Sequence, residues 1–304
     1  MTPAPLLSVI ILNWIHLTDP LDCLHSLVRQ IYSNYFVIVV NDGSTDGSVP
    51  ALQAQFPAIT LLANPSNLGF AEGNNIGIRS ALSHAVSYVL LLNNDTVVDA
   101  ALIEELVAAA ESDERIAALG AKILYFAEPD RLWSAGGNVN YTETVARLRG
   151  YRQRDSGQFD RMADVDYVSG CAMLLRRQAL EQIGLLDPVF SPAYFEDTDW
   201  CMRARRTGWR IVYVPAARVW HKVSMSSGGE YNVRERYLIG FNSIQFMRRY
   251  ANARAWLKFS FYAIGSLPLL YLVRICQGRG RGVVAKGLGL WDGLRGARRD
   301  TFLK

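Results

Sequence analysis

The most restrictive feature of this 304-residue chain is an alternation of short apolar runs and helical patterns in its first hundred residues. The apolar runs cover residues 7–12, 36–40, 59–62 and 88–92, and helical spacing covers residues 18–30 and 69–83. Short runs that are apolar at successive positions and rich in Val, Ile and Leu are typical of strands buried on both faces. Strand, helix and strand in succession form βαβ units, so the sequence predicts an α/β protein with a mostly parallel sheet and flanking helices.

Polar side chains follow three of these predicted strands. Asn13, Asp42 and Asp95 each come shortly after the end of one of them. Ligands of open parallel sheets bind beyond the carboxyl ends of the strands, so these three residues are expected at the same edge. A turn would explain any one of these clusters, but three of them at three strand ends predict a binding site.

Asp42 lies in the segment NDGSTDGS. A carboxylate only accepts hydrogen bonds, so Asp42 suits a ligand that offers an N–H group, such as the imide of uracil or thymine. Aspartate and serine are also common where a strand passes into a helix, and Ser44 or Asp46 is expected to cap the next helix. From the residues alone, nucleobase recognition and a structural turn are both open.

The segment Asn93-Asn94-Asp95 ends the most hydrophobic strand of the chain and is the better metal candidate. Mg²⁺ and Mn²⁺ prefer oxygen ligands, and Mn²⁺ also accepts imidazole. A divalent cation held by a carboxylate neutralises the charge that develops on a diphosphate leaving group. Asp95, with Asn93 and a distant histidine, would suit such a cation, although asparagine and aspartate are equally favoured in an ordinary turn.

A cluster of carboxylates marks the segment YFEDTDWCMRARRTGWRIVYVPAARVWH, residues 194–221. Glu196, Asp197 and Asp199 fall within four positions at the start of a predicted helix. A packed core has no use for such a group, so the cluster is a candidate active site. The alternative is a helix start whose acids suit the helix dipole, with Asp199 and Arg203 in an ordinary surface ion pair.

His221 ends the strand predicted after this helix. A lone histidine in such a position is more often structural, and His16, His25 and His84 are assigned no function. The chain has no GxSxG, GxGxxG or GxxxxGK[ST] segment, which argues against serine hydrolases, Rossmann dehydrogenases and P-loop ATPases. Its four cysteines show no paired spacing, which predicts free thiols in a reducing compartment.

The middle of the chain continues the alternation less regularly. Strands are predicted at residues 116–119, 122–125 and 165–175, a hairpin at residues 138–141 and 145–148, and helices at residues 100–110 and 177–183. No internal repeat or low-complexity segment interrupts the pattern.

The C-terminal region differs from the rest in charge. Residues 248–304 hold twelve Lys and Arg side chains against two Asp, within a chain of formal net charge +4. Residues 233–250 predict a helix, and residues 259–273 carry no charge. That uncharged stretch spans about 22 Å as a helix, less than the ~30 Å hydrocarbon layer. We therefore expect it at a membrane interface, with the basic residues on anionic headgroups; a helix pair packed on the body or on a partner subunit is the alternative.

Several segments in order resemble the family 2 inverting glycosyltransferases, in particular bacterial rhamnosyltransferases and related cell-surface polysaccharide enzymes. They are LSVIILNW, VIVVNDGSTDGS, NLGFAEGNNIGI, YVLLLNNDTVVD, DYVSGCAMLLRRQALEQIGLLDPVF and the segment at 194–221, and the match covers about residues 6–245. The resemblance implies a GT-A fold, a nucleotide-diphosphate sugar donor, and Mg²⁺ or Mn²⁺. Residues 1–245 are then expected to form the transferase domain, and residues 246–304 a helical, basic extension that associates with the membrane.

Matched position by position, the resemblance also implies roles for single side chains. Asp197 matches the catalytic base, with Glu196 beside it, and Asp95 and His221 match metal ligands. Residues expected to bind the nucleotide sugar are Asn13, Asp42, Asn67, Gly69, Asn74, Asn93 and Asn94. Asn93 stands where many members of the family have aspartate, which leaves one charge fewer at the metal.

The implied reaction is inverting transfer of a sugar to a saccharide or lipid-linked acceptor, with dTDP-rhamnose or a UDP-sugar as donor. The protein is expected in the cytoplasm, peripheral on the inner face of the cell membrane, with no nucleic-acid partner. One alternative is a non-catalytic module that binds nucleotide sugars. Another is a sugar-phosphate nucleotidyltransferase, which would carry a glycine-rich GGxGTRL-like loop where this chain has LNWIHLTDP.

Overall fold

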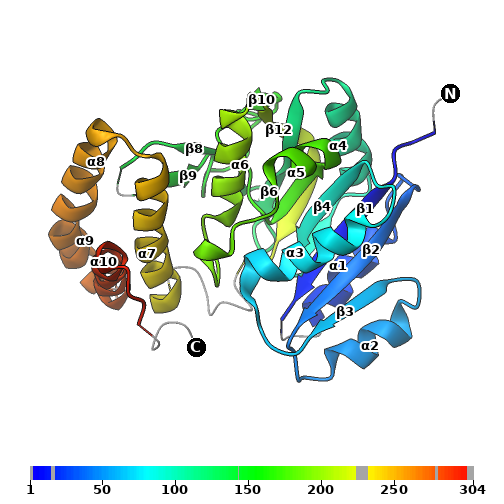
Figure 1. Ribbon diagram of the computed structural model, residues 1–304, viewed down its shortest axis with the longest axis horizontal. Helices are drawn as coiled ribbons and strands as arrows, with labels where there is room; N and C mark the ends of the chain where they lie inside the picture. Colours follow the sequence, from blue (N-terminus) through cyan, green and yellow to red (C-terminus); the bar gives the residue numbers. More distant parts are fainter. Residues whose placement is uncertain (1–2, 15–17, 143, 224–231, 278–279, 300–304) are drawn as a thin grey trace.

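A ten-stranded sheet runs through the centre of the computed structural model, which describes residues 3–14, 18–142, 144–223, 232–277 and 280–299 (Figure 1). Four strands are parallel to one another in the order β3-β2-β1-β4: β1 (Leu7–Asn13), β2 (Tyr35–Asp42), β3 (Thr60–Asn64) and β4 (Tyr88–Asn93). They are the four strands predicted from the apolar runs. The parallel half of the sheet is therefore confirmed, and its carboxyl edge carries Asn13, Asp42 and Asn93.

The other half of the sheet is mixed. β11 (Ala172–Arg176) lies antiparallel between β4 and β6 (Ile116–Tyr125), and β6 pairs in parallel with β12 (Arg210–His221). Shorter strands extend this half at its margins: β5 (Thr96–Val98), β7 (Leu132–Ser134) and β10 (Ala163–Asp164). The predicted hairpin is confirmed as β8 (Gly137–Val139) paired with β9 (Ala146–Leu148) in a separate two-stranded sheet.

Helices cover both faces of the sheet (Figure 1). On one face lie α1 (Thr18–Leu27), α2 (Ser48–Gln55) and α4 (Leu102–Glu111), and on the other α3 (Gly69–Leu82), α5 (Arg177–Ile183) and α6 (Glu196–Arg206). Successive side chains of β1 alternate between the two cores: Val9 and Ile11 pack on the first face and Ile10 on the second. This alternation explains why the strand reads as a continuous apolar run.

Two predicted strands differ from the observed ones. The strands expected at residues 116–119 and 122–125 form one strand, β6, which passes through Gly120. A Cβ at Gly120 would lie 2.5 Å from the Cβ of Val168, so glycine is needed there for close packing and does not break the strand. Of residues 165–175, predicted as one strand, those from 172 onward belong to β11. The chain before them leaves the regular strand, and the amide of Gly170 binds the carboxylate of Asp197 instead.

The C-terminal helices are α7 (Val233–Tyr250), α8 (Ala253–Phe259), α9 (Leu267–Ile275) and α10 (Gly280–Arg295), with a π-helical turn at Ser260–Ile264. α10 packs closely along α7. A Cβ at Gly289 would clash with the carbonyl of Tyr237, so this close approach requires glycine. The predicted helix at residues 233–250 is confirmed. The predicted domain boundary at 245/246, however, falls inside α7, where Phe246 and Met247 pack in one core with Phe190.

The uncharged stretch at 259–273 belongs to a longer helical run, Ala253–Ile275. Its 23 residues cover about 35 Å, and in the described part of the chain it is the one run that could cross a membrane by length and composition. The predicted uncharged stretch lies within this run, and the helix begins before it, so that Arg254 and Lys258 are also helical. Both side chains are exposed, so neither charge is buried by the helix.

Candidate active site

A cavity of about 1140 Å³ opens at the carboxyl ends of the parallel strands and reaches to the C-terminal helices. Nine of the predicted site residues line it: Asp42, Asn67, Gly69, Asn93, Asn94, Asp95, Glu196, Asp197 and His221. Asn13 and Asn74 do not line it. Segments far apart in the sequence thus converge on one space, as the strand-end argument requires.

Asp95 and His221 face each other in this cavity. The Nε2 atom of His221 lies 3.0 Å from Oδ1 of Asp95, and both side chains are almost fully buried. Strand pairing brings them together, since His221 pairs with Thr96, the neighbour of Asp95, and the amide of Lys222 donates to the Asp95 carbonyl. The edge of the Trp133 ring packs on the imidazole and fixes its position further.

This pair fits a divalent cation. The two atoms lie within hydrogen-bond distance of each other, and a carboxylate oxygen and an imidazole nitrogen are both ligands that Mn²⁺ would accept. Burial lowers the pKa of His221, the Cys171 sulfur and the Asp95 carboxylate raise it, and the net direction is upward. No group of three or more His, Cys, Asp or Glu side chains forms a metal site among the described residues. The protein therefore offers two ligands at this point, and the diphosphate of a donor would offer more.

Asn13 and Asn94 form a buried support beneath the metal candidates. The side-chain amide of Asn94 donates to Oδ1 of Asn13 at 3.0 Å, and that of Asn13 donates to the Ser48 hydroxyl at 3.3 Å. These bonds join the ends of β1 and β4 to the start of α2. Asn13 thus holds the strand ends in place, and its side-chain amide makes hydrogen bonds to Asn94 and Ser48. Asn74 is also buried, and its side chain donates to the carbonyl of Phe70 in its own helix.

Asp42 both lines the cavity and organises the loop before α3. Its carboxylate accepts hydrogen bonds from the amides of Leu68 and Gly69 and from the side chain of Asn64. Gly69 has φ +84, and a Cβ there would lie 2.7 Å from the Ser191 hydroxyl, so only glycine fits the turn. These hydrogen bonds are the ones expected if Asp42 shapes a turn. Asp42 also lines the cavity.

Asp197 lies in the first turn of α6. Its Oδ2 atom accepts from the amide of Gly170 at 2.9 Å, and Oδ1 accepts from the amide and the hydroxyl of Thr198. Burial raises the pKa of Asp197, these hydrogen bonds lower it, and the net direction is upward. The two residues before α6, Tyr194 and Phe195, both have φ 80, and this left-handed turn aims the start of the helix at the cavity.

Glu196 is a buried carboxylate on the same cavity wall. Only 5% of the residue is exposed, and its Oε2 atom has no hydrogen-bond partner among the described residues. Burial, followed by the neighbouring charge of Asp197, raises the pKa of Glu196 well above its usual value. The neighbouring acids therefore differ in environment: Asp197 is held by donors, whereas Glu196 is desolvated with little compensation.

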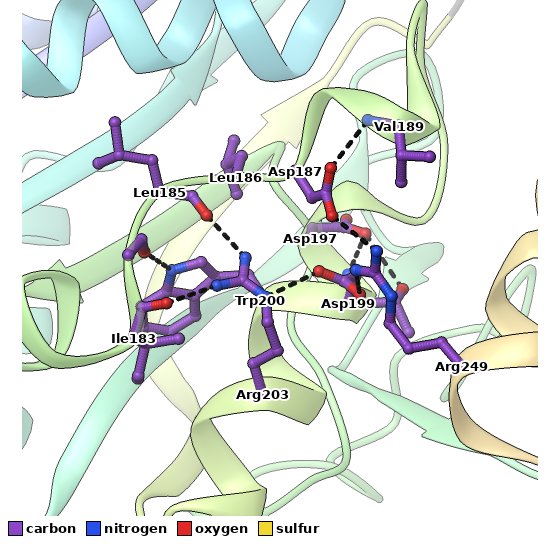
Figure 2. A network of polar contacts seen from close by, with 12 residues as sticks. Ile183, Leu185, Leu186, Asp187, Val189, Asp197, Asp199, Trp200, Arg203 and Arg249 are labelled. Atoms are coloured by element: carbon purple, nitrogen blue, oxygen red, sulfur yellow. Dashed lines mark hydrogen bonds and ion pairs between the residues drawn. The ribbon is translucent and has the colours of Figure 1, made fainter.

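Asp199 has a structural role (Figure 2). The ion pair with Arg203 considered from the sequence is present, but Asp199 is fully buried, so its expected position at the surface is wrong. Arg203 bonds Oδ2 at 2.9 Å, and Arg249 and the hydroxyl of Tyr250, both from α7, bond Oδ1 at 2.6 and 2.7 Å. Arg249 also reaches Asp187 at 2.7 Å. The end of α7 is thus tied to the helix that carries Asp197.

Sequence reasoning missed several residues of the cavity wall. Gly170, Tyr167 and Arg149 line it, and so do Arg234, Arg236 and Arg274 of the C-terminal helices. The guanidinium of Arg149 lies over the ring of Phe159 at 5.4 Å. The basic charge of residues 248–304 was the one available signal for Arg274, and no local pattern marks the others.

Comparison with known proteins places these features in a family. A family model described as glycosyltransferase like family 2 matches residues 3–237. The N-acetylglucosaminyl-diphospho-decaprenol L-rhamnosyltransferase of Mycobacterium tuberculosis is 29% identical over 220 residues, covering 63% of this chain and 68% of the relative. The poly-beta-1,6-N-acetyl-D-glucosamine synthase of Staphylococcus aureus is 24% identical over 230 residues, covering 73% of this chain and 51% of the relative. The chain thus spans about half the length of the latter.

Solved structures show the same fold. GalNAc-T7 with UDP, GalNAc and Mn²⁺ has a TM-score of 0.62 at 13% identity, covering 90% of this chain and 58% of the other. The mannosyltransferase PcManGT from Pyrobaculum calidifontis, with GDP-Man and Mn²⁺, has a TM-score of 0.59 at 15% identity, covering 98% and 77%. Identity this low shows the fold alone. Because the family model also spans most of the chain, the protein belongs to glycosyltransferase family 2 and has the GT-A fold.

Proposed function

We propose that this protein transfers a sugar from a nucleotide-diphosphate donor with inversion at the anomeric carbon, and that the transfer depends on Mg²⁺ or Mn²⁺. The observation that carries the proposal is the convergence of Asp95, Asp197 and His221 on one cavity from three separate segments. Asp95 and His221 are the metal ligands in this scheme, and Asp197 is the general base. Asn67, Asn93 and Asp42 belong to the donor side of the cavity.

Asp197 takes the proton from an acceptor hydroxyl as that oxygen attacks the anomeric carbon. The bond from the acceptor oxygen to carbon forms while the bond from carbon to the diphosphate oxygen breaks, and the diphosphate leaves with the electron pair. Hydrogen bonds from Gly170 and Thr198 hold the carboxylate in one orientation during this step. When bound at Asp95 and His221, a divalent cation supplies positive charge to the leaving diphosphate.

The donor is proposed as dTDP-rhamnose, with a UDP-sugar as the alternative, and the acceptor as a saccharide or lipid-linked saccharide of a cell-surface polysaccharide. The name of the Mycobacterium tuberculosis relative supports both choices, since it is called an L-rhamnosyltransferase of N-acetylglucosaminyl-diphospho-decaprenol. Two neighbours in the fold are described with Mn²⁺ and a nucleotide or nucleotide sugar, which supports the cofactor.

Peripheral attachment to the inner face of the cell membrane completes the proposal. Large apolar side chains are exposed along the helical run Ala253–Ile275, among them Leu257, Phe261, Leu269 and Leu272. Phe259 and Ala263 of the same run pack into the core beneath α7, so one side of the run is held on the body. An amphipathic, basic surface of this kind suits an anionic bilayer.

The fraction of protein that sediments with vesicles should rise with their phosphatidylglycerol content. Equal binding to vesicles of phosphatidylcholine alone would contradict the proposed attachment to an anionic membrane.

The experiment that tests the function is a thermal-shift screen of nucleotide diphosphates and their sugars with Mn²⁺, followed by transfer assays with the stabilising donor. A ligand at 100 times its dissociation constant adds about 2.7 kcal/mol to the free energy of unfolding. Transfer or donor hydrolysis that requires the metal supports the proposal. Binding of a nucleotide sugar without turnover on any saccharide or lipid-linked acceptor would instead identify a non-catalytic binding module.

A further inference from the structure

A basic wall lies in the cavity on the side formed by the C-terminal helices. Arg234 and Arg236 come from the first turn of α7, and Arg274 comes from α9. All three line the same cavity as Asp95 and Asp197, and all three are partly buried. Guanidinium groups from two separate helices therefore share one enclosed space with the proposed catalytic residues.

The charge of this wall favours an anion. Glu235 also lines the cavity and forms an ion pair with Arg236 at 3.1 Å, while Arg274 donates to the side chain of Gln277 at 2.7 Å. Among the described residues that line this side of the cavity, the three arginines outnumber the one carboxylate, that of Glu235. The N-terminus of the 18-residue helix α7 adds its dipole in the same sense. Arginine presents a planar fork of donors that matches the oxygens of phosphate.

The helix α9 joins this wall to an apolar surface. Arg274 lines the cavity, whereas Leu272, Val273 and Ile275, its neighbours along the helix, are exposed. The same helix thus presents a cation to the cavity and hydrocarbon to the outside. A molecule with an anionic head and a hydrocarbon chain fits this arrangement, because its charge can lie inside while its chain lies along α9 or in a bilayer beside it.

We propose that Arg234, Arg236 and Arg274 bind the phosphate or diphosphate group of a lipid-linked acceptor and so present its sugar to Asp197. This inference rests on the proposed transfer function and assigns a subsite to its acceptor. The donor also carries a diphosphate, but that group is assigned to the end of the cavity where Asp95 and His221 lie. The tests below distinguish the diphosphate of the donor from the phosphate or diphosphate of the lipid-linked acceptor.

The first test measures binding without turnover. Farnesyl diphosphate is titrated by calorimetry into the full chain whose donor site is filled with the nucleotide diphosphate found in the thermal-shift screen and Mg²⁺. We expect saturable binding that weakens at least tenfold in Arg274→Gln and in Arg236→Gln. Arg254→Gln is the matched control, because Arg254 is an exposed arginine of α8 that does not line the cavity. Absence of binding in the unchanged chain, or equal weakening in the control, would overturn the proposal.

The second test uses kinetics with two acceptors that share one sugar. One carries the sugar on a short prenyl diphosphate, and the other is the uncharged alkyl glycoside. Arg274→Gln should lower kcat/KM at least tenfold for the first and leave the second and the donor KM unchanged, and Arg274→Lys should restore part of the loss. A rise in donor KM would assign the arginines to the donor instead. Equal losses on both acceptors would show a purely structural role. The melting temperature of each variant should equal that of the unchanged chain, which shows that the variant is folded.

Discussion

The carboxylate of Asp95 and the imidazole of His221 lie 3.0 Å apart, although 126 residues separate them in the chain. β5 and β12 pair so that the residue after Asp95 lies opposite His221, and the two side chains then meet at the wall of the cavity. A carboxylate oxygen and an imidazole nitrogen are both ligands that Mn²⁺ would accept. The sheet itself therefore builds the proposed metal site.

His221→Ala should abolish stabilisation by Mn²⁺ and lower the transfer rate, because it removes one of the two proposed side-chain ligands. We expect a loss of about 10–100-fold or more, since even residues that only support metal ligands cost this much. The shift in melting temperature on adding Mn²⁺ and a nucleoside diphosphate measures the effect. His84→Ala, a change at an exposed histidine, is the control. An unchanged Mn²⁺ response in His221→Ala would rule out the assigned ligand.

Asp197→Asn should lower the transfer rate by about 10²–10⁴-fold while leaving donor binding nearly intact, because it removes the group that accepts the acceptor proton. The amide keeps the size of the side chain and one oxygen for the bond from Gly170. Single-turnover rates and donor titrations with the same preparation separate the two effects. Near-normal turnover in Asp197→Asn would move the role of base to another group, and Glu196→Gln identifies whether Glu196 is that group.

The value of kcat should fall at low pH, and the midpoint of this acid limb should lie above the usual aspartate pKa of about 3.9. The net upward shift of the Asp197 pKa keeps this carboxylate protonated to higher pH, and activity is lost as pH falls through the pKa in the complex. Thr198→Val removes one hydrogen bond that favours the ionised form, so the limb should move upward by about one pH unit. Thr207→Val, at the other end of α6, should leave the limb in place. A downward movement in Thr198→Val would contradict Asp197 as the titrating group.

Glu196→Gln should raise the free energy of unfolding at pH 8 by about 1–3 kcal/mol, since it removes a buried carboxylate whose Oε2 has no hydrogen-bond partner in the part of the chain that the structure describes. The pKa of Glu196 is raised in the folded chain, so the folded state holds the proton more tightly than the unfolded state. The stability of the unchanged protein is then highest below the unfolded pKa and falls as pH rises through the folded pKa. The gain in Glu196→Gln should therefore shrink as pH falls toward 4.

Chemical denaturation at several pH values measures this difference. Glu104→Gln, at an exposed position of α4, should change stability little at any pH. A lower stability of Glu196→Gln at pH 8 would mean that the ionised carboxylate is itself stabilised in the folded chain.

Arg249→Ala should lower the free energy of unfolding by about 1–3 kcal/mol, because Asp199 is fully buried and would keep Arg203 and Tyr250 as its side-chain partners among the described residues. Arg248→Ala, at the exposed neighbouring position, should change it by less than about 0.5 kcal/mol. Truncation after residue 245 removes Arg249 and Tyr250 together and should cost more than Arg249→Ala. A truncated chain as stable as the full one would support the predicted boundary at 245/246 and contradict the role of α7.

Local patterns in the sequence predict much of the architecture. The apolar runs at residues 7–12, 36–40 and 88–92 correspond to β1, β2 and β4, and the hairpin and the helix at 233–250 also follow from periodicity. These features depend on neighbours a few residues apart, which one-dimensional spacing records. The position of Asp42 and Asp95 at one edge follows as well, because parallel strands point the same way.

Long-range packing decides the rest, and no local pattern records it. Gly170 leaves a predicted strand because its amide binds Asp197, and Asp199 is buried because Arg249 reaches it from a helix fifty residues later. Glu196 and Asp197 are adjacent in sequence, yet only the folded chain gives one a set of donors and leaves the other desolvated. Sequence alone led to the proposal of which residues carry the chemistry. Tertiary structure decided their burial and partners, because both depend on segments that meet only when the chain folds.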